Sequence, residues 1–399
     1  MNKFKDPISA YLAKRGLNLP PVYKNFSGFR EVVVVVPCFN ELKNLPHLLS
    51  SFLANNNSTF GEITTLFVVN HPENATFEKK ASSIDTVKFL IDFGNNSNLP
   101  MAIIDMPGEG REVPAKFAGA GYPRKTGLDS AISLTDPARP DNSLLVSVDA
   151  DCLVSPSYFT RLIGLARRGC KAAVLEYKHR EDDPDNIDAI REYEAYLRSY
   201  TEGLKYAGSP YAWHFIGSTM VSNVSTYVKA GGMNTRRAAE DFYFLESIAK
   251  VTQIESINEV LVFPSNRVSD RVIFGTGKAM NDRKGTGKAI MPYPPVVFER
   301  LKSFLSVYHE QHNSAEQLTD SIRKSDEETF NFLESYKFSS AMNNIYKSSK
   351  SASQISKQKD IWFDALKTMR LVSLFRTSEP QQPRTCKLRN LGASESQIL

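Results

Sequence analysis

The chain has few cysteines, and their spacing excludes two classes of protein. Its 399 residues include only Cys38, Cys152, Cys170 and Cys386, with no CxxC pair and no zinc-type spacing among them. A disulfide scaffold needs many closely spaced cysteines, and a structural zinc site needs paired ones. The composition therefore indicates a reducing compartment, and we expect a cytoplasmic protein.

Long apolar runs are missing as well. The longest, at 32–36, is far shorter than the roughly 20 residues that span a bilayer. The N-terminus has basic residues but no apolar core followed by a small-residue cleavage site. We expect no transmembrane helix and no signal peptide, and peripheral contact with a membrane stays open.

The chain also lacks a strong charge of either sign. Its 49 Lys and Arg residues exceed the 44 Asp and Glu residues by five, and the stretch 267–302 carries eight basic side chains against three acidic ones. Because nucleic-acid binders carry such basic stretches, a non-catalytic nucleic-acid-binding protein is one alternative. A filter-binding titration against salt would test it.

The chain does contain a regular alternation of β-branched runs with helical patterns. This alternation is typical of βαβ units, a mostly parallel sheet, and ligands at the carboxyl ends of the strands. The sequence therefore predicts an α/β fold. We expect strands at 31–41, 63–70, 101–105, 143–149 and 171–177, and helices at 42–54, 77–93, 125–134, 155–168, 186–205 and 239–251.

Changes in composition divide the chain into five predicted segments. The fourth is all-helical, and the third is an irregular basic, Gly-rich loop that repeats GTGKA. Alanine follows each Lys of this repeat, so it is not a phosphate-binding P-loop. The segments are an N-terminal extension (1–28), the α/β domain (29–263), the basic loop (264–294), a helical appendage (295–376) and a tail expected to be disordered (377–399).

Two aspartates follow the strand predicted at 143–149. Asp149 and Asp151 are separated by one residue, so their carboxylates can converge on one cation once the chain turns. Hard oxygen ligands suit Mg²⁺ or Mn²⁺. Aspartate is also common in turns, which leaves a plain turn as the alternative.

An ordered set of motifs resembles the family 2 glycosyltransferases, which have the GT-A fold. The set is PCFNE at 37–41, VDAD at 148–151, GGMN at 231–234 and the pair Glu240–Asp241, within a resemblance that covers about residues 30–263. The resemblance implies a nucleotide-diphospho-sugar transferase fold with a helical region behind it. The implied activity is transfer of a sugar, with inversion, from a nucleoside-diphosphate sugar to an acceptor hydroxyl.

The resemblance also implies which residues meet the nucleotide. Pro37 and Glu41 would lie against the base and ribose, and Arg124 and Lys125 would touch the nucleotide or its diphosphate. Asn70 stands where the family often has an aspartate that contacts the base. This departure leaves UDP- and GDP-linked donors both open. A solvated side chain is the alternative for Lys125.

Metal and phosphate contacts follow from the same resemblance. Asp151 would bind the Mn²⁺ or Mg²⁺ that bridges the two phosphates, and Asp149 would contact this metal or the ribose. A cation is expected because the leaving group is a nucleoside diphosphate. Arg267 and Arg271, in the basic loop, are candidates for the diphosphate, with a solvated loop as the alternative.

The predicted catalytic residues are Glu240 and Asp241, of which Asp241 is the base. Its place at a helix start should favour the ionised form that a base needs. The alternative is that both acidic residues only stabilise the helix end. Trp213 and His214 precede GSTM in the expected acceptor region, although such a pair is more often core. The acceptor would be a glycan, a lipid-linked molecule or a small molecule. We expect no nucleic-acid partner.

The nearest enzymatic alternative is a sugar nucleotidyltransferase. Such enzymes have a related fold and need a metal, but they normally carry a Gly-rich loop after the first strand. The sequence PCFNELKN at 37–44 contains no glycine. The motifs therefore favour the glycosyltransferase.

Overall fold

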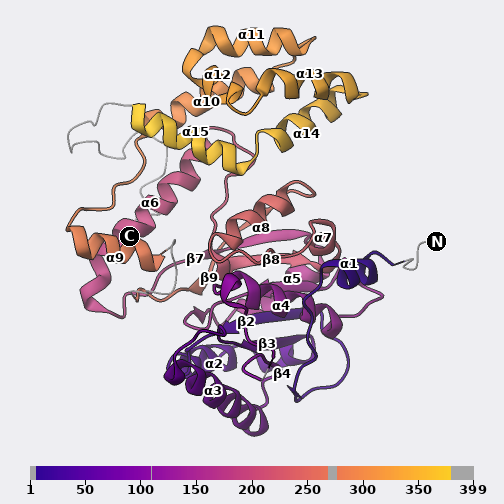
Figure 1. Ribbon diagram of the computed structural model, residues 1–399. Helices are drawn as coiled ribbons and strands as arrows, with labels where there is room; N and C mark the ends of the chain where they lie inside the picture. The colour runs from indigo at the N-terminus through magenta and orange to yellow at the C-terminus, as the bar shows by residue number, and fades with distance from the viewer. Residues whose placement is uncertain (1–5, 109, 268–275, 379–399) are drawn as a thin grey trace. The chain divides into compact units, whose positions relative to one another are not determined.

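The computed structural model describes residues 6–108, 110–267 and 276–378. The chain divides into two compact units (Figure 1). The first comprises Met1–Glu202 with Tyr211–Pro292, and the second comprises Gly203–Pro210 with Tyr293–Leu399.

The first unit is built on a sheet whose described strands have the order β1-β4-β3-β2-β5-β8-β7-β9-β6. Six of them (β2, β3, β4, β5, β7 and β9) run in one direction, and β1, β6 and β8 run in the other. The predicted α/β class with a mostly parallel sheet is therefore confirmed. The strands are β1 (Tyr23–Lys24), β2 (Val32–Cys38), β3 (Ile63–Val69), β4 (Met101–Asp105), β5 (Leu144–Ser147), β6 (Leu153–Val154), β7 (Ala172–Tyr177), β8 (Met220–Asn223) and β9 (Glu255–Phe263).

Helices connect these strands, and short 3-10 turns occur between them. The helices are α1 (Pro7–Arg15), α2 (Leu45–Leu53), α3 (Phe77–Asn96), α4 (Gly121–Ala131), α5 (Tyr158–Arg167), α6 (Ile187–Tyr206), α7 (Val224–Lys229), α8 (Glu240–Ala249) and α9 (Thr276–Thr286). The 3-10 turns are η1 (Asn57–Gly61), η2 (Ala115–Phe117), η3 (Ile132–Leu134), η4 (Pro184–Asn186) and η5 (Gly217–Thr219).

Strand β2 is buried on both faces, which explains its unbroken run of valines. Val32, Val34 and Val36 belong to the core that includes α2 and α5, while Val35 meets α4 on the other face. A Cβ atom on Gly127 of α4 would lie 2.3 Å from Cγ1 of Val35. Glycine is therefore required for α4 to come this close. A strand covered on both faces has no polar side to alternate with.

The segment predicted as an N-terminal extension packs into the first unit. β1 pairs with β4, and Tyr11 of α1 is buried. The Tyr11 hydroxyl donates to Asp129 of α4 (2.7 Å) and accepts from the ammonium of Lys125 (2.8 Å). Asp129 is fully buried; it pairs with Lys125 (2.9 Å) and also accepts from the Tyr227 hydroxyl (2.7 Å) and the N–H of Leu17 (2.8 Å). This cluster joins α1, α4 and α7.

The basic loop predicted at 264–294 is not irregular throughout. Residues 276–286 form α9, and 268–275, with Arg271, lie outside the described residues. Helix α9 has almost no amphipathic pattern, which is why its sequence does not indicate a helix. Tertiary contacts stabilise it instead: Ala279 packs beside Tyr193 of α6, and Arg283 pairs with Glu192 (2.8 Å).

The second unit confirms the predicted C-terminal helical region. Its core contains Phe304, Tyr308, Phe338 and Phe363, whose rings are in contact. In the described part of the chain, no helix combines the length and the apolar character that a membrane span requires. The helices are α10 (Pro295–His309), α11 (Ala315–Ser325), α12 (Glu327–Glu334), α13 (Phe338–Ser348), α14 (Ala352–Trp362) and α15 (Ala365–Ser378). The rest of the predicted tail, 379–399, lies outside the described residues.

The cluster around Asp129 predicts a large stability effect. Asp129→Asn removes the charge that balances the buried ammonium of Lys125 and should lower the free energy of unfolding by about 3–5 kcal/mol, the usual cost of breaking a buried pair. Denaturant unfolding followed by circular dichroism measures it. As a control, Asp85→Asn alters an exposed pair with Lys88 and should change stability little. Equal stability of the two variants would contradict the assignment.

Candidate active site

Four strand ends supply polar side chains to one edge of the sheet. Glu41 follows β2, Asn70 follows β3, Asp149 and Asp151 follow β5, and Arg267 follows β9. β6 begins two residues after Asp151 and pairs with the end of β9, through Leu153 opposite Phe263. This short antiparallel pair brings the residues after β9 to the residues after β5.

Arg124 lies at the centre of the site. Its side chain is only 3% exposed, and it projects from α4 to three acceptors. Its Nε donates to Oγ of Ser147 (2.9 Å), one terminal nitrogen pairs with Asp149 (2.5 Å), and the other pairs with Glu240. A Cβ atom on Gly217 would lie 2.8 Å from the guanidinium nitrogens, so η5 needs glycine there. One arginine thus joins α4, β5 and α8.

Arg267 forms a second bridge. Its Nε donates to Oδ2 of Asp151 (2.7 Å), and a terminal nitrogen pairs with Oε1 of Glu41 (2.5 Å). Glu41 is nearly buried, whereas Asp151 is 20% exposed. Both aspartates of the VDAD motif are therefore paired with an arginine, Asp149 with Arg124 and Asp151 with Arg267.

The GGMN motif positions the start of α8. Gly231 and Gly232 both have positive φ values (87° and 73°), and a Cβ atom on Gly232 would fall 1.7 Å from the hydroxyl of Tyr11. The side chain of Asn234 donates to the backbone carbonyl of Glu240 (2.8 Å). Through Asn234, the motif therefore helps to position the start of α8, where Glu240 and Asp241 lie.

Negative charge exceeds positive charge at this edge. Burial raises the pKa of Glu240 above its usual 4.5, and the nearby Asp241 adds to this effect although Arg124 opposes it. Burial likewise raises the pKa of Asp241, and Asp149 contributes to the rise. This differs from the lowering expected at a helix start, because three carboxylates share one guanidinium and are partly removed from water.

The donor set fits a hard divalent cation that shares its coordination with a substrate. Within the described ranges, no three His, Cys, Asp or Glu side chains form a metal cluster. Asp149 and Asp151 nevertheless offer carboxylate oxygens two positions apart in the loop between β5 and β6. Mg²⁺ is commonly bound by one or two carboxylates together with substrate phosphates, so a third protein ligand is not required.

The other residues that were predicted to contact the nucleotide differ in their surroundings. Pro37 lies within β2, opposite Val68 of β3. The carboxamide nitrogen of Asn70 donates to the carbonyls of Cys38 (3.2 Å) and Val68 (3.1 Å), so it ties two strand ends together. Lys125 is directed to Asp129 in the interior. Arg271 lies outside the described residues.

Two contributors were not predicted, Ser147 and Gly217. Ser147 is the last residue of β5, two positions before Asp149, and a polar side chain at the end of an otherwise apolar strand is the signal that could have identified it. Gly217 begins the GSTM segment. Its role depends on the approach of Arg124, 93 positions earlier in the chain, which no local pattern shows.

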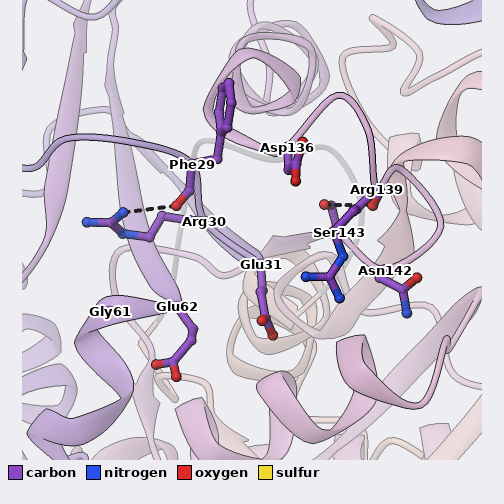
Figure 2. A pocket seen from close by; sticks show the side chains of 9 residues that line it. All are labelled: Phe29, Arg30, Glu31, Gly61, Glu62, Asp136, Arg139, Asn142 and Ser143. Carbon is purple, nitrogen blue, oxygen red and sulfur yellow. Dashed lines mark hydrogen bonds between the residues drawn. The ribbon is translucent and has the colours of Figure 1, made fainter.

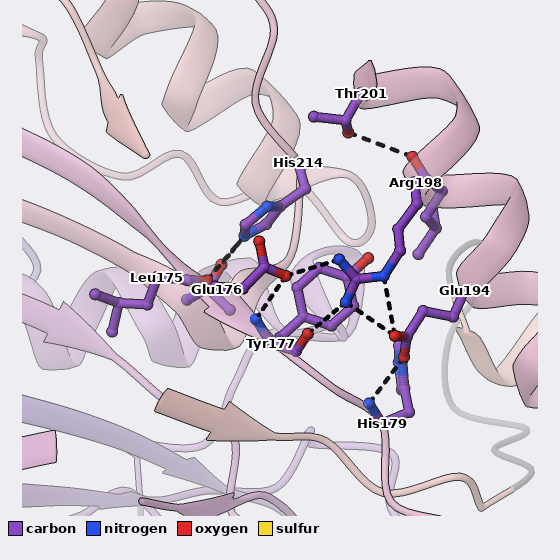
Figure 3. A network of polar contacts seen from close by, with 10 residues as sticks. Leu175, Glu176, Tyr177, His179, Glu194, Arg198, Thr201 and His214 are labelled. Atoms are coloured by element: carbon purple, nitrogen blue, oxygen red, sulfur yellow. Dashed lines mark hydrogen bonds and ion pairs between the residues drawn. The ribbon is translucent and has the colours of Figure 1, made fainter. Parts of the chain in front are cut away.

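Trp213 and His214, which the sequence places in the expected acceptor region, have structural contacts, and those of His214 are shown in Figure 3. Nε2 of His214 lies 3.0 Å from the carbonyl oxygen of Leu175, and burial lowers the pKa of His214 to about 4. Trp213 is buried against Tyr211 and Phe215. These contacts are those of core residues.

Two surface hollows lie outside this cluster. One, of about 220 Å³, is lined by residues such as Glu31, Glu62 and Ser143 next to the amino ends of β2, β3 and β5, the opposite edge of the sheet (Figure 2). The other, of about 250 Å³, is lined by residues including His179 and Glu194, which belong to the network in Figure 3. Neither includes the paired aspartates.

Comparison with known proteins gives only distant likenesses. No family model and no curated protein matches the chain. Among solved structures, the chain is similar to S. aureus TarS 1-349 in complex with UDP-GlcNAc (12% identity, 88% of this chain and 93% of that one, TM-score 0.41). It is also similar to the mannosyltransferase PcManGT from Pyrobaculum calidifontis in complex with GDP-Man and Mn²⁺ (15%, 93% and 94%, TM-score 0.39). These likenesses assign neither a family nor an activity.

The raised pKa of Glu240 predicts a pH dependence of stability. Because the folded chain holds this proton more tightly than the unfolded chain, the stabilisation is complete below the usual pKa of 4.5 and is lost as the pH rises through the raised value. In Glu240→Gln this loss is absent. The Tm of the wild type should therefore fall relative to that of the variant as the pH rises from about 4.5 to about 8.

Glu194 provides a control of opposite sign. Although burial opposes it, hydrogen bonds from His179 and the charge of Arg198 lower the pKa of Glu194 to about 2. Its stabilisation is present above pH 4.5 and is lost as the pH falls toward 2. The Tm difference between wild type and Glu194→Gln should therefore shrink in acid. A Tm difference between the wild type and Glu240→Gln that does not change between about pH 4.5 and about pH 8 would contradict the raised pKa of Glu240.

Proposed function

We propose that the chain is an inverting glycosyltransferase of the GT-A type, similar to family 2. It would move a sugar from a UDP- or GDP-linked donor to an acceptor hydroxyl with Mn²⁺ or Mg²⁺. The observation that supports this best is the gathering of carboxylates at the carboxyl edge of the sheet. Asp149 and Glu240 pair with Arg124, which Asp241 also influences electrostatically, and Asp151 pairs with Arg267. This edge is where ligands of such sheets bind.

The charge of the site supports a divalent cation. Glu41, Asp149, Asp151, Glu240 and Asp241 carry five negative charges when ionised, against the two positive charges of the bridging arginines, which leaves an excess of three. A diphosphate is itself an anion, so this excess would repel it. A cation held by Asp151 and Asp149 would remove the repulsion and stabilise the charge that develops on the leaving diphosphate.

Asp241 is proposed as the catalytic base. Its carboxylate would take the proton of the acceptor hydroxyl, whose oxygen attacks the anomeric carbon from the side opposite the leaving diphosphate. Burial raises the pKa of Asp241, which makes its carboxylate a stronger base. Glu240, which is buried against Arg124, would hold that arginine in place rather than exchange a proton with the substrate.

The donor contacts are assigned from the same edge. Pro37 and Glu41 follow the sequence prediction and would border the base and ribose, with Asn70 holding the two strand ends that form this border. Arg267 would reach the diphosphate, as would Arg271. Lys125 is given a structural role instead, because its ammonium is buried between Asp129 and Tyr11.

The alternatives account for fewer of these contacts. A sugar nucleotidyltransferase would need a Gly-rich loop after the first core strand, and β2 is followed by residues without glycine. A nucleic-acid binder would need the basic charge of 267–302 to be accessible. Arg267, Arg283 and Arg300 of that stretch are each paired with carboxylates of the chain, which reduces the charge that they offer to a polyanion.

The metal assignment is tested at Asp151. UDP or GDP should raise the Tm of the wild type when Mn²⁺ is present, since a ligand at 100 times its Kd stabilises by about 2.7 kcal/mol. Asp151→Asn should abolish this Mn²⁺-dependent rise while keeping the Tm of the unliganded protein close to that of the wild type. A thermal-shift screen of nucleoside diphosphates with and without Mn²⁺ measures both.

Asp85→Asn is the matched control for this experiment. Asp85 of α3 pairs with Lys88 (3.4 Å) at an exposed position, and the variant should respond to nucleotide like the wild type. An unchanged response of Asp151→Asn would contradict the metal site. A wild type that responds to no nucleoside diphosphate would contradict the proposed function.

The base is tested at Asp241. Asp241→Asn keeps the size of the side chain but cannot accept the acceptor's proton, so transfer should slow by roughly 100-fold or more. The Kd for UDP or GDP should change little, because the residue acts on the acceptor side. The measurement is release of nucleoside diphosphate from UDP- and GDP-sugars with a panel of hydroxyl acceptors, beside the nucleotide Kd.

The alternative for Asp241 is a helix-capping role. Asparagine caps a helix about as well as aspartate, so a variant that only lost a cap would transfer at nearly the normal rate. Near-normal transfer would therefore contradict the catalytic role without contradicting the fold. Asp85→Asn, an exposed change of the same type, serves as the control.

A further inference from the structure

Arg267 lies between two carboxylates that the proposed donor site also uses. Its Nε donates to Oδ2 of Asp151 (2.7 Å), and a terminal nitrogen pairs with Oε1 of Glu41 (2.5 Å). Glu41 follows β2 and Asp151 follows β5, so a side chain from beyond β9 links the ends of two other strands. The arginine thus holds a positive charge on the carboxylate that was predicted to bind the metal.

The backbone that carries Arg267 is anchored. The buried side chain of Asn266 exchanges two hydrogen bonds with the backbone of Asp183 (3.0 and 3.2 Å). The N–H of Arg180 donates to the carbonyl of Pro264 (2.8 Å), and the guanidinium of Arg180 donates to the carbonyl of Asp151 (3.0 Å). The fold therefore fixes both the origin of Arg267 and the loop that carries its partner.

A divalent cation and this guanidinium make competing demands on Asp151. The cation needs the lone pairs of the carboxylate oxygens, and Oδ2 already accepts the N–H of Arg267. Two cationic groups on one carboxylate also repel each other, strongly so where water is partly excluded. Arg267 is only 31% exposed and Asp151 only 20% exposed, so solvent screens this repulsion incompletely.

We propose that Arg267 exchanges with the divalent cation on Asp151. The guanidinium of Arg267 neutralises Asp151 until the cation binds. It then keeps its ion pair with Glu41 and turns its other N–H groups to the phosphates of the donor. A guanidinium has five N–H donors and binds phosphate oxygens in pairs, so it suits both states. This inference rests on the proposed function, and it names Arg267 as the residue that couples metal binding to donor binding.

The exchange predicts opposite effects of one substitution. In Arg267→Gln the guanidinium no longer competes with the cation for Asp151. The affinity for Mn²⁺ alone should therefore rise about fivefold, which corresponds to the free energy of a partly exposed ion pair. The affinity for UDP or GDP at saturating Mn²⁺ should fall about tenfold, because a charged contact to phosphate is lost. Mn²⁺ electron paramagnetic resonance measures the first and calorimetric titration the second.

Two further variants keep the test decisive. Arg267→Lys retains the charge but cannot reach both carboxylates as a fork does, so its Mn²⁺ affinity should lie between those of wild type and Arg267→Gln. Arg161→Gln removes the same charge from the Arg161–Glu259 pair on the surface and should leave both affinities at the wild-type values. If Arg267→Gln does not fold, the lysine variant carries the test.

Each result has a distinct meaning. The exchange is overturned if Arg267→Gln binds Mn²⁺ no more tightly than the wild type does. Where Arg267→Lys replaces the glutamine variant, the same result for the lysine variant overturns it. An unchanged affinity for UDP and GDP overturns the proposed turn toward the phosphates. A wild type that binds neither Mn²⁺ nor UDP or GDP contradicts the proposed function itself, whereas normal binding by the wild type with no gain in the variants contradicts only the exchange.

Discussion

The buried guanidinium of Arg124 is the contact on which the arrangement of the site depends. It joins Asp149, which is 25 positions away, to Glu240, which is 116 positions away, and it also binds Ser147. A buried charge is stable only with partners, and removing one partner typically costs several kcal/mol. Helix α4, strand β5 and the start of α8 are therefore tied together by electrostatics as well as by apolar packing.

Two features of the chain make this contact geometrically possible. Gly217 leaves the space that the guanidinium fills, and Gly127 lets α4 lie against Val35 of β2. Behind α4, the cluster of Tyr11, Lys125 and Asp129 attaches the N-terminal helix to the same element. Two adjacent residues of α4 therefore have different roles, because Arg124 is directed to the site and Lys125 to the interior.

An excess of negative charge links the electrostatics of the site to its proposed chemistry. The carboxylates outnumber the two bridging arginines. Burial raises the pKa values of Glu240 and Asp241, and the neighbouring carboxylates add to this rise. The same excess would oppose an anionic donor unless a cation came with it. The excess of negative charge would then contribute both to the raised pKa of the base and to the requirement for a cation. In the proposed exchange, Arg267 pairs with Asp151 only while the cation is absent.

Local pattern in the sequence was sufficient for the central strands, most of the helices and the residues at the strand ends. Burial on both faces produced the valine run of β2, and the two aspartates follow an apolar strand directly. Tertiary structure alone decided what depends on distant partners: the antiparallel direction of β8, helix α9 with its weak pattern, and the interior position of Lys125. It also decided the pairing of Arg124 and Arg267 with particular carboxylates. The reason is that hydrophobic period is a property of neighbouring residues, whereas strand pairing and ion pairing require residues that only folding brings together.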